Sequence, residues 1–404
     1  MPTERELFLR HLAQTSSTPL FLEIERAEGC WMYHKDGKKI LDLISGIGVS
    51  SVGHRHPAVI NAIEAQLKKH LHLMVYGEFV QSPQVMLAEK LSKLLPKEID
   101  SFYFVNSGAE AIEGAMKLAR RFTGREKMVA FKNSYHGSTQ GAMSIMSNES
   151  IRKGYGALLP GISFATFNDE KSLSVISGDT ACVIIEAIQG EAGVILPEKG
   201  FLKKVKERCD ETGALLILDE IQTGFGRTGS FMAFESFRIL PGILCMAKGM
   251  GGGMPIGCFA SSGEIMKVLS EDPALGHLTT FGGNAVSCVA AGAVVDVLAS
   301  PLTPLPGGEG NLISAVRGKS ELFRKLLVHP KIKELRSAGL LIAVEFESRE
   351  FNMKVISSCI ENGVLTDWFL FNDKSMRIAP PLTITHEEIE FACDVIRKAI
   401  ASAS

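Results

Sequence analysis

Residues 215–222, with the sequence LLILDEIQ, decide the fold class. Four apolar residues in a row, without polar alternation, are typical of a strand that is buried on both faces of a sheet. An amphipathic helix is predicted just before this strand, over residues 201–209. A buried strand that alternates with helices indicates an α/β fold with a parallel sheet covered on both sides.

Similar apolar runs recur between residues 100 and 260, with helical patterns between them. They predict the remaining strands of a large α/β domain over residues 56–304. Pro57 suits the first turn of the helix that opens this domain. The further predicted strands are 102–105, 128–131, 182–185, 244–247 and 256–260.

The two ends of the chain predict a second, smaller unit. Before residue 50 the pattern is a short helix and a hairpin, with a turn at 35–38. After residue 310 it is two or three helices and a strand at 340–346. The Pro- and Gly-rich stretch 300–310 is the best boundary. The prediction is a discontinuous α+β domain made of 1–55 and 305–404.

Composition excludes several classes of protein. The 404 residues carry 43 Lys and Arg against 45 Asp and Glu, a net charge of −2, so the basic surface that nucleic-acid binders need is absent. Eight scattered cysteines form no CxxC motif, and no apolar run approaches the roughly 20 residues of a membrane span. The start of the chain lacks a signal-peptide pattern. We expect a soluble, cytoplasmic protein with no metal, membrane or nucleic-acid partner.

Polar or glycine-bearing segments directly follow five of the predicted strands. In open α/β sheets, ligands bind beyond the carboxyl ends of the strands. These segments therefore converge on one edge, where we expect the functional site. They are 106–111 (NSGAEA), 134–137 (SYHG), 186–191 (EAIQGE), 219–222 (DEIQ) and Lys248.

The first of these segments predicts an anion site. Ser107 and Glu110 have the spacing of a helix capping box. Because the helix begins straight after a strand and includes Gly108, its free amides would point at a phosphate. The alternative is a well-capped helix and nothing more.

Asp219 and Lys248 each end an apolar strand, at matching positions. A buried carboxylate needs a cationic or protonated partner, and burial makes a lysine amine nucleophilic toward a carbonyl. With the flat ring of Tyr135 and a phosphate cradle, this set suits pyridoxal phosphate, which offers an aldehyde, a pyridine nitrogen and a ring face. The alternative for a lone lysine is a solvated side chain.

Two other patterns are interpreted as structural. The GxGxxG sequence at 224–229 lies past the strand end and opens no clear helix, so a dinucleotide site is not expected. The pairs His54/His56 and His70/His72 lack a third nearby ligand for a metal.

Over residues 19–382 the chain resembles the class III aminotransferases. These are fold-type I pyridoxal-phosphate enzymes, and the likeness is to the acetylornithine, ornithine and 4-aminobutyrate group. The resemblance implies a large domain with a mixed, mostly parallel sheet between helices. Its motifs are GHRHP (53–57), NSGAEA (106–111), YHG (135–137), QGE (189–191), LDEIQTGFGRTG (218–229), KG (248–249) and TTFGGN (279–284).

The resemblance also implies roles around the cofactor ring. Lys248 would form the internal aldimine and shuttle the proton. Asp219 would keep the pyridine nitrogen protonated, Gln222 would hydrogen-bond the ring hydroxyl, and Tyr135 would stack on the ring.

The resemblance implies a homodimer with shared active sites. The phosphate would be held by Ser107, Gly108 and Ala109 of one subunit and by Thr280 of the neighbouring one.

Substrate recognition is implied for two more residues. Arg377 would clasp an α-carboxylate, and Glu191 would mask this arginine when an ω-amine occupies the site. The pair points to glutamate and 2-oxoglutarate as one substrate couple; the alternative is a purely structural ion pair. Ser138 stands where these enzymes usually carry an arginine, and Ile47 where ornithine transaminases have a tyrosine, so the amino donor stays open.

The expected function is a ping-pong aminotransferase that moves an amino group between an amine or ω-amino acid and 2-oxoglutarate. The alternative is an aminomutase or amino-acid racemase that uses the same cofactor on the same fold. Glu191 and Arg377 favour the transaminase, because a one-substrate isomerase needs no gate.

Overall fold

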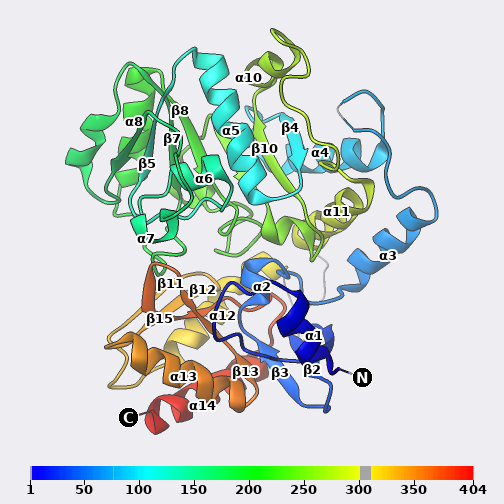
Figure 1. The fold of residues 1–404 in the computed structure, drawn as a ribbon, viewed down its shortest axis with the longest axis vertical. Coiled ribbons are helices and arrows are strands. Elements are labelled where there is room, and N and C mark those ends of the chain that lie inside the picture. Colours follow the sequence, from blue (N-terminus) through cyan, green and yellow to red (C-terminus); the bar gives the residue numbers. More distant parts are fainter. Residues whose placement is uncertain (1, 76, 301–310, 404) are drawn as a thin grey trace.

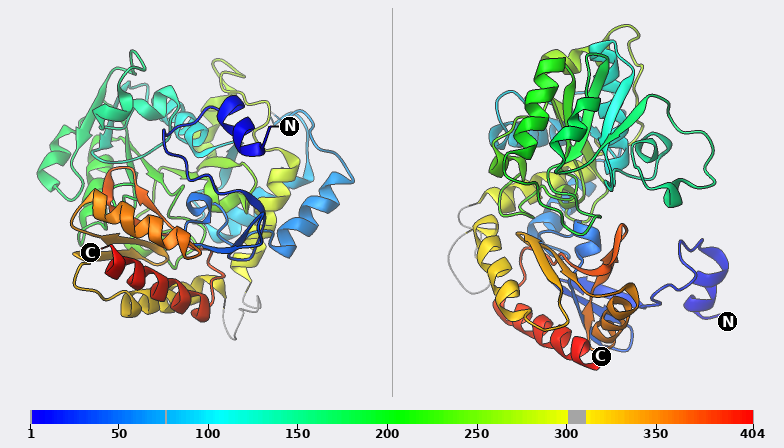
Figure 2. Two further views of the ribbon diagram at one scale, coloured as in Figure 1. Left: turned by 60° about the horizontal axis from the view of Figure 1, so that its bottom comes forward. Right: turned by 90° about the vertical axis from the view of Figure 1, so that its left-hand side faces the viewer.

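The computed structural model describes residues 2–75, 77–300 and 311–403. Figure 1 shows two lobes: a large sheet lies between helices in the upper one, and the lower one combines the blue N-terminal and the orange-to-red C-terminal segments. The side view in Figure 2 shows the same separation.

The upper lobe is built on a seven-stranded sheet with the order β4-β10-β9-β8-β7-β5-β6. Its central strands β5, β7, β8 and β9 run parallel, whereas β10 is antiparallel to both of its neighbours. The prediction of a mixed, mostly parallel sheet is confirmed. The strands are β4 (Ser101–Val105), β5 (Lys127–Phe131), β6 (Ile162–Ala165), β7 (Thr180–Glu186), β8 (Leu215–Asp219), β9 (Ile243–Met246) and β10 (Gly257–Ser261).

Helices cover both faces of this sheet. Successive residues of β7 alternate between two buried clusters: Ile184 packs in the cluster that contains α5 (Gly108–Thr123), and Val183 packs in the cluster that contains α8 (Phe201–Thr212) and α11 (Ala285–Ala299). This two-sided burial explains why the strands read as continuous apolar runs. The shorter helical segments and the outer helices of this lobe are α3 (Pro57–Leu67), α4 (Ser82–Leu94), α6 (Gln140–Ser144), α7 (Glu149–Arg152), α9 (Phe234–Phe237), α10 (Gly263–Met266), η1 (Glu170–Val175), η2 (Lys248–Gly251) and η3 (Lys267–Ser270).

The lower lobe contains two sheets, and the first of them joins strands from both ends of the chain. Its first sheet has the order β1-β2-β3-β13, and β13 pairs parallel with β3 although more than 300 residues separate them. The second sheet has the order β11-β12-β15-β14. The elements are α1 (Glu4–His11), β1 (Ile24–Glu28), β2 (Trp31–His34), β3 (Lys39–Asp42), α2 (Ser45–Gly48), α12 (Leu312–Leu326), β11 (Glu334–Ala338), β12 (Leu341–Glu345), α13 (Arg349–Glu361), β13 (Val364–Leu365), β14 (Asp367–Phe369), β15 (Asn372–Ile378) and α14 (His386–Ser402).

The domain boundaries near residues 55 and 305 stay a prediction. The Pro- and Gly-rich stretch that suggested the second boundary lies, from residue 301 to 310, outside the described residues. The edge strand β6 has no counterpart among the predicted strands. All eight cysteines are buried and free. In the described part of the chain, no helix combines the length and apolarity that crossing a membrane requires.

Candidate active site

A cavity of about 470 Å³ lies at the carboxyl ends of the central strands. The segments that follow β4, β5, β7, β8 and β9 all contribute to its wall, as the sequence predicts. Eight of the ten predicted site residues line it: Ser107, Gly108, Ala109, Tyr135, Glu191, Asp219, Gln222 and Lys248.

The N-terminus of α5 opens onto this cavity. Ser107 caps the helix by accepting a hydrogen bond from the Glu110 amide at 3.2 Å. The predicted capping box is only half formed, because the Glu110 carboxylate accepts from the backbone and side-chain nitrogens of Asn106, both at 2.9 Å. An added Cβ at Gly108 would lie 2.9 Å from Cδ1 of Ile221, so a larger residue at this position would require the Ile221 side chain to move. Free amides at a helix N-terminus can bind an anion.

Asp219 ends β8 in a fixed orientation. Its Oδ1 accepts a hydrogen bond from the Ile221 amide at 3.0 Å, and its Oδ2 lies 2.7 Å from Nδ1 of His136. Both side chains are buried, and Nε2 of His136 has no hydrogen-bond partner within the described residues. Sequence reasoning did not single out His136, although it lies within the quoted YHG segment.

Lys248 follows β9 at the start of η2, with a positive φ of 46°. For a residue other than glycine this is a strained backbone conformation, which proteins retain mainly at functional sites. Burial lowers the pKa of the Lys248 amine more than the nearby Glu191 and Asp219 carboxylates raise it. The amine is therefore a better nucleophile than a solvated lysine.

Glu186 is a second buried carboxylate that sequence reasoning missed. Its Oε1 accepts from the Tyr135 amide at 3.1 Å, and its Oε2 accepts from the Gly190 amide at 2.8 Å. Burial raises the pKa of Glu186 to about 7. One side chain therefore ties together the loop that carries Tyr135 and the loop that carries Glu191.

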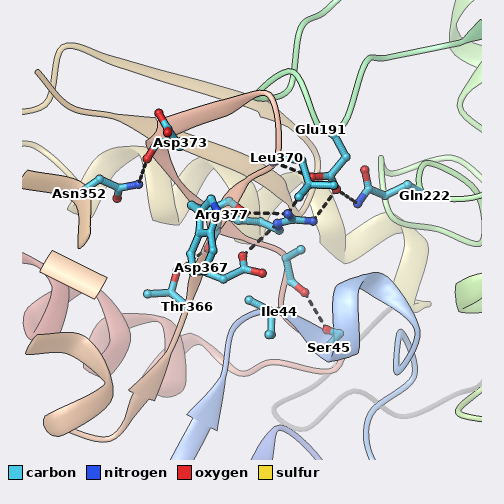
Figure 3. Close-up of polar contacts among 12 residues, drawn as sticks. Ile44, Ser45, Glu191, Gln222, Asn352, Thr366, Asp367, Leu370, Asp373 and Arg377 are labelled. Carbon is cyan, nitrogen blue, oxygen red and sulfur yellow. Dashed lines mark hydrogen bonds and ion pairs between the residues drawn. The ribbon is translucent and has the colours of Figure 1, made fainter. Parts of the chain in front are cut away.

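Glu191 and Arg377 form a buried pair with two hydrogen bonds, at 2.7 and 3.0 Å (Figure 3). Gln222 donates a weaker bond to Oε1 of Glu191, at 3.4 Å. Burial opposes the charge on Glu191, but Arg377 and Lys248 outweigh it and hold the pKa of this carboxyl below its usual range. The arginine lies behind Glu191, which itself lines the cavity.

A family model described as "Aminotransferase class-III" matches residues 12–400. The chain belongs to the class III aminotransferases. It is 39% identical, over 96% of its own length and 97% of the relative's, to the acetylornithine aminotransferase of Archaeoglobus fulgidus.

Two solved aminotransferase structures share the fold across almost the whole chain. The ornithine aminotransferase of Toxoplasma gondii superposes with a TM-score of 0.90 at 29% identity, covering 99% of this chain and 95% of the other. The adenosylmethionine-8-amino-7-oxononanoate aminotransferase of Methanocaldococcus jannaschii gives 0.89 at 28% identity, covering 99% of each chain. These matches confirm the predicted fold type and enzyme class.

Class III aminotransferases depend on pyridoxal phosphate, and the Toxoplasma structure is described with partial occupancy of PLP at its active site. The residues of this cavity fit that group. The start of α5 suits a phosphate, Asp219 suits a protonated pyridine nitrogen, and Lys248 suits an aldehyde. The loop that carries Tyr135 packs closely on the start of α5, because an added Cβ at Gly137 would lie 2.6 Å from Cβ of Ala109.

Two predicted site residues, Arg377 and Thr280, lie outside the cavity wall. Of the two positions at which the sequence departs from the related enzymes, Ser138 lines the cavity and Ile47 does not. Arg377 contacts Glu191 and is not part of the cavity wall, and Thr280 is exposed outside the wall. Ser138 is in the wall, with its hydroxyl 3.2 Å from that of Tyr135. Ile47 is half-buried and does not line the cavity.

Arg227 and the pair His54/His56, which belong to the patterns interpreted as structural, have structural partners. Arg227, within the GxGxxG segment, is fully buried and donates to the Leu340 carbonyl at 3.0 Å; turns surround it and no helix begins there. His54 lies 2.8 Å from Asp42, and His56 caps α3. Among the described residues there is no group of three or more metal-ligating side chains.

Proposed function

We propose that this enzyme moves an amino group between a donor that carries an ω-amine and 2-oxoglutarate, with glutamate as the other amino acid of the cycle. The Glu191–Arg377 pair carries this proposal. A glutamate α-carboxylate and an ω-amine must occupy the same pocket in alternate half-reactions. An arginine that is available to the first and covered by Glu191 for the second meets both needs.

The chain's own residues would then act as follows. When bound, pyridoxal phosphate supplies an aldehyde for the amino group and an electron-withdrawing ring. Asp219, oriented by His136, would hold a negative charge at the ring nitrogen. Nζ of Lys248 would hold the aldehyde and later move a proton to and from the substrate carbon. Tyr135 would cover one ring face, Gln222 would bond the ring hydroxyl, and Ser107, Gly108 and Ala109 would hold the phosphate.

Mixing the purified holoenzyme with glutamate alone tests the proposal. We expect the absorbance of the aldehyde form of the cofactor to disappear, and 2-oxoglutarate to appear in equal amount. An isomerase would convert poorly, because it returns the amino group to its own substrate. A holoenzyme that leaves glutamate unchanged would overturn the proposed acceptor.

The donor is constrained by the wall of the cavity. Among the described lining residues, Lys248 is the only lysine or arginine. A donor α-carboxylate near Ser138 would find hydroxyl groups there instead of a guanidinium. We therefore propose a donor that is bound through its ω-amine and does not need a lysine or arginine to hold a carboxylate at its other end. Rates with N-acetylornithine, ornithine, 4-aminobutyrate and simple amines, each paired with 2-oxoglutarate, test this; a large preference for N-acetylornithine would contradict it.

Arg377→Ala should impair the glutamate half-reaction far more than the amine half-reaction. Losing a charge-assisted, two-bond clasp should lower kcat/KM for glutamate by about tenfold or more. Glu191→Ala should do the reverse, because an uncovered Arg377 disfavours the ω-amine. Single-turnover rates for each half-reaction check both effects. Equal losses in both half-reactions for each variant would show that the pair is structural.

We also propose a homodimer in which Thr280 completes the neighbouring site. Thr280 is exposed and lies outside the cavity wall of its own chain, and the residue before it, Thr279, lines a largely apolar hollow of about 770 Å³. Phe79, Val80 and Leu275 line this hollow and are more than half exposed. An exposed apolar surface of this kind supports an interface with a second copy of the chain, because exposed apolar patches are typical of protein–protein interfaces.

Hybrid dimers of Thr280→Ala and Lys248→Ala should regain activity. If Thr280 acts across the interface, each hybrid has one site with both changes and one site of unchanged sequence. If Thr280 serves its own chain, both hybrid sites are damaged and little activity returns. Each variant mixed with itself is the control. An active monomer in ultracentrifugation would contradict the shared site.

A further inference from the structure

The strand β14 and the residue before it hold Arg377 in place: Thr366 binds its backbone, and Trp368 and Phe369 contact its guanidinium. The Thr366 hydroxyl donates to the Arg377 carbonyl at 2.5 Å, and the Trp368 carbonyl accepts from Nη2 of Arg377 at 2.8 Å. The ring of Phe369 lies 4.7 Å from Cζ of the arginine. These contacts do not involve Glu191, so Arg377 keeps its place when its partner on the cavity side changes.

Asp367, the first residue of β14, adds a second carboxylate to Arg377. It is directly opposite Arg377 in the strand register, and its Oδ1 lies 3.0 Å from Nε. Within the described residues, neither of these two atoms makes a hydrogen bond of good geometry. Asp367 therefore acts on Arg377 through its charge, while Trp368 and Phe369 orient the side chain.

Figure 3 shows Glu191 and Asp367 on two sides of the same guanidinium. One positive charge thus faces two negative ones. A substrate α-carboxylate that takes the place of Glu191 leaves Asp367 where it is. The incoming carboxylate meets an arginine that is already paired.

The surroundings of Asp367 make its charge sensitive to pH. Burial raises the pKa of Asp367 to about 6; Glu191 and Asp42 raise it too, and Arg377 opposes them. Asp42, at the end of β3, is itself held by His54 at 2.8 Å. Asp367 is therefore charged at pH 8 and loses its charge progressively as the pH falls through about 6.

We propose that Asp367 is a specificity-determining residue: its negative charge beside Arg377 weakens the binding of a substrate α-carboxylate at that arginine, and protonation of Asp367 at lower pH relieves this weakening. This inference rests on the proposed glutamate half-reaction. It assigns the two carboxylates different tasks. Glu191 covers the arginine, and Asp367 limits how tightly the uncovered arginine holds a dicarboxylate substrate or product.

Asp367→Asn tests the proposal, because the amide keeps the size of the side chain and an acceptor oxygen while removing the charge. The probe is glutarate, a dicarboxylate with no amino group, titrated into the holoenzyme by calorimetry. At pH 8 the variant should bind glutarate about fivefold more tightly. This change in affinity lies between the small effect of removing a solvated charge and the large effect of removing a fully buried one. At pH 5.5 the difference between the two proteins should become smaller, because part of Asp367 in the unaltered enzyme is then protonated and uncharged.

Glutamate should behave in the same way in the single-turnover half-reaction, with a lower apparent Kd in the variant at pH 8 and an unchanged limiting rate. Asp367→Ala removes the same charge and should shift glutarate binding in the same direction. The matched control is Asp373→Asn, which removes an exposed carboxylate from β15 that pairs with Arg349; it should leave glutarate binding unchanged.

Three outcomes would overturn the proposal: equal glutarate affinity at pH 8, a shift that is the same at both pH values, or weaker binding in Asp367→Asn. The last would show that Asp367 only positions the arginine. Failure of the unaltered enzyme to convert glutamate would instead count against the proposed function. The effect of the charge on glutarate binding remains measurable in that case.

Discussion

Replacing Lys248 by Ala should lower the rate of transamination by at least about 10⁴-fold, since the change removes both the amine that holds the aldehyde and the group that moves the proton. In the unaltered protein, borohydride should fix the cofactor onto one peptide, the one that contains Lys248. The position of this lysine supports the expectation. It follows β9 in a strained backbone conformation and lies in the cavity wall with Asp219.

Lys319 provides a control for the chemistry of buried amines. It is 5% exposed, donates to the Leu382 carbonyl at 2.6 Å, and burial lowers its pKa to about 8. If a depressed pKa alone directed the reaction, Lys319 would also be labelled. We expect no cofactor on Lys319, and near-normal rates for Lys319→Arg. Peptide mapping that placed the adduct on another lysine would remove Lys248 from the active site.

The fold could be predicted wherever burial is two-sided. Strand β8 and its neighbours read as apolar runs because α5 packs against one face of the sheet and α8 and α11 against the other. The edge strand β6 (Ile162–Ala165) was missed because it is half-buried and has a polar residue at its centre, which removes that signal.

The antiparallel direction of β10 could have been predicted from the sequence. Residues 247–256 connect β9 to β10, and a parallel crossover needs a dozen residues or more. The pattern of apolar runs gives the strands but not their direction. Connection lengths add that information.

The residues at each strand end could be predicted from the sequence, but the contacts between side chains from different strand ends could not. Ser107, Asp219 and Lys248 are marked by their place directly after a strand. The contact between His136 and Asp219 joins residues 83 positions apart, and the one between Glu186 and the Tyr135 amide spans 51. Side chains whose partners are distant in the sequence produce no local sequence motif. His136 and Glu186, which orient other groups of the cavity, are therefore recognised only in the folded structure.

Asp219→Asn should lower turnover by about 10³-fold while the fold is kept. The amide oxygen can still accept from the Ile221 amide, but a neutral amide cannot stabilise a protonated pyridine nitrogen. Half-reactions with glutamate and with the amine donor should slow together, because both need the electron-withdrawing ring. The absorbance spectrum of the bound cofactor should shift as well, since it reports the protonation of the ring.

Glu220→Gln is the matched control for this change. Glu220 is the next residue, is fully buried, and accepts hydrogen bonds from the Ala233 and Phe234 amides at 3.2 and 2.7 Å, yet it does not line the cavity. Both substitutions replace a buried carboxylate by an amide, so both should lower Tm by a comparable amount. Only Asp219→Asn should change the cofactor spectrum and the two half-reactions. If Asp219→Asn retains turnover within about tenfold, the charge at position 219 serves the fold through His136, and the ring must be activated by another group.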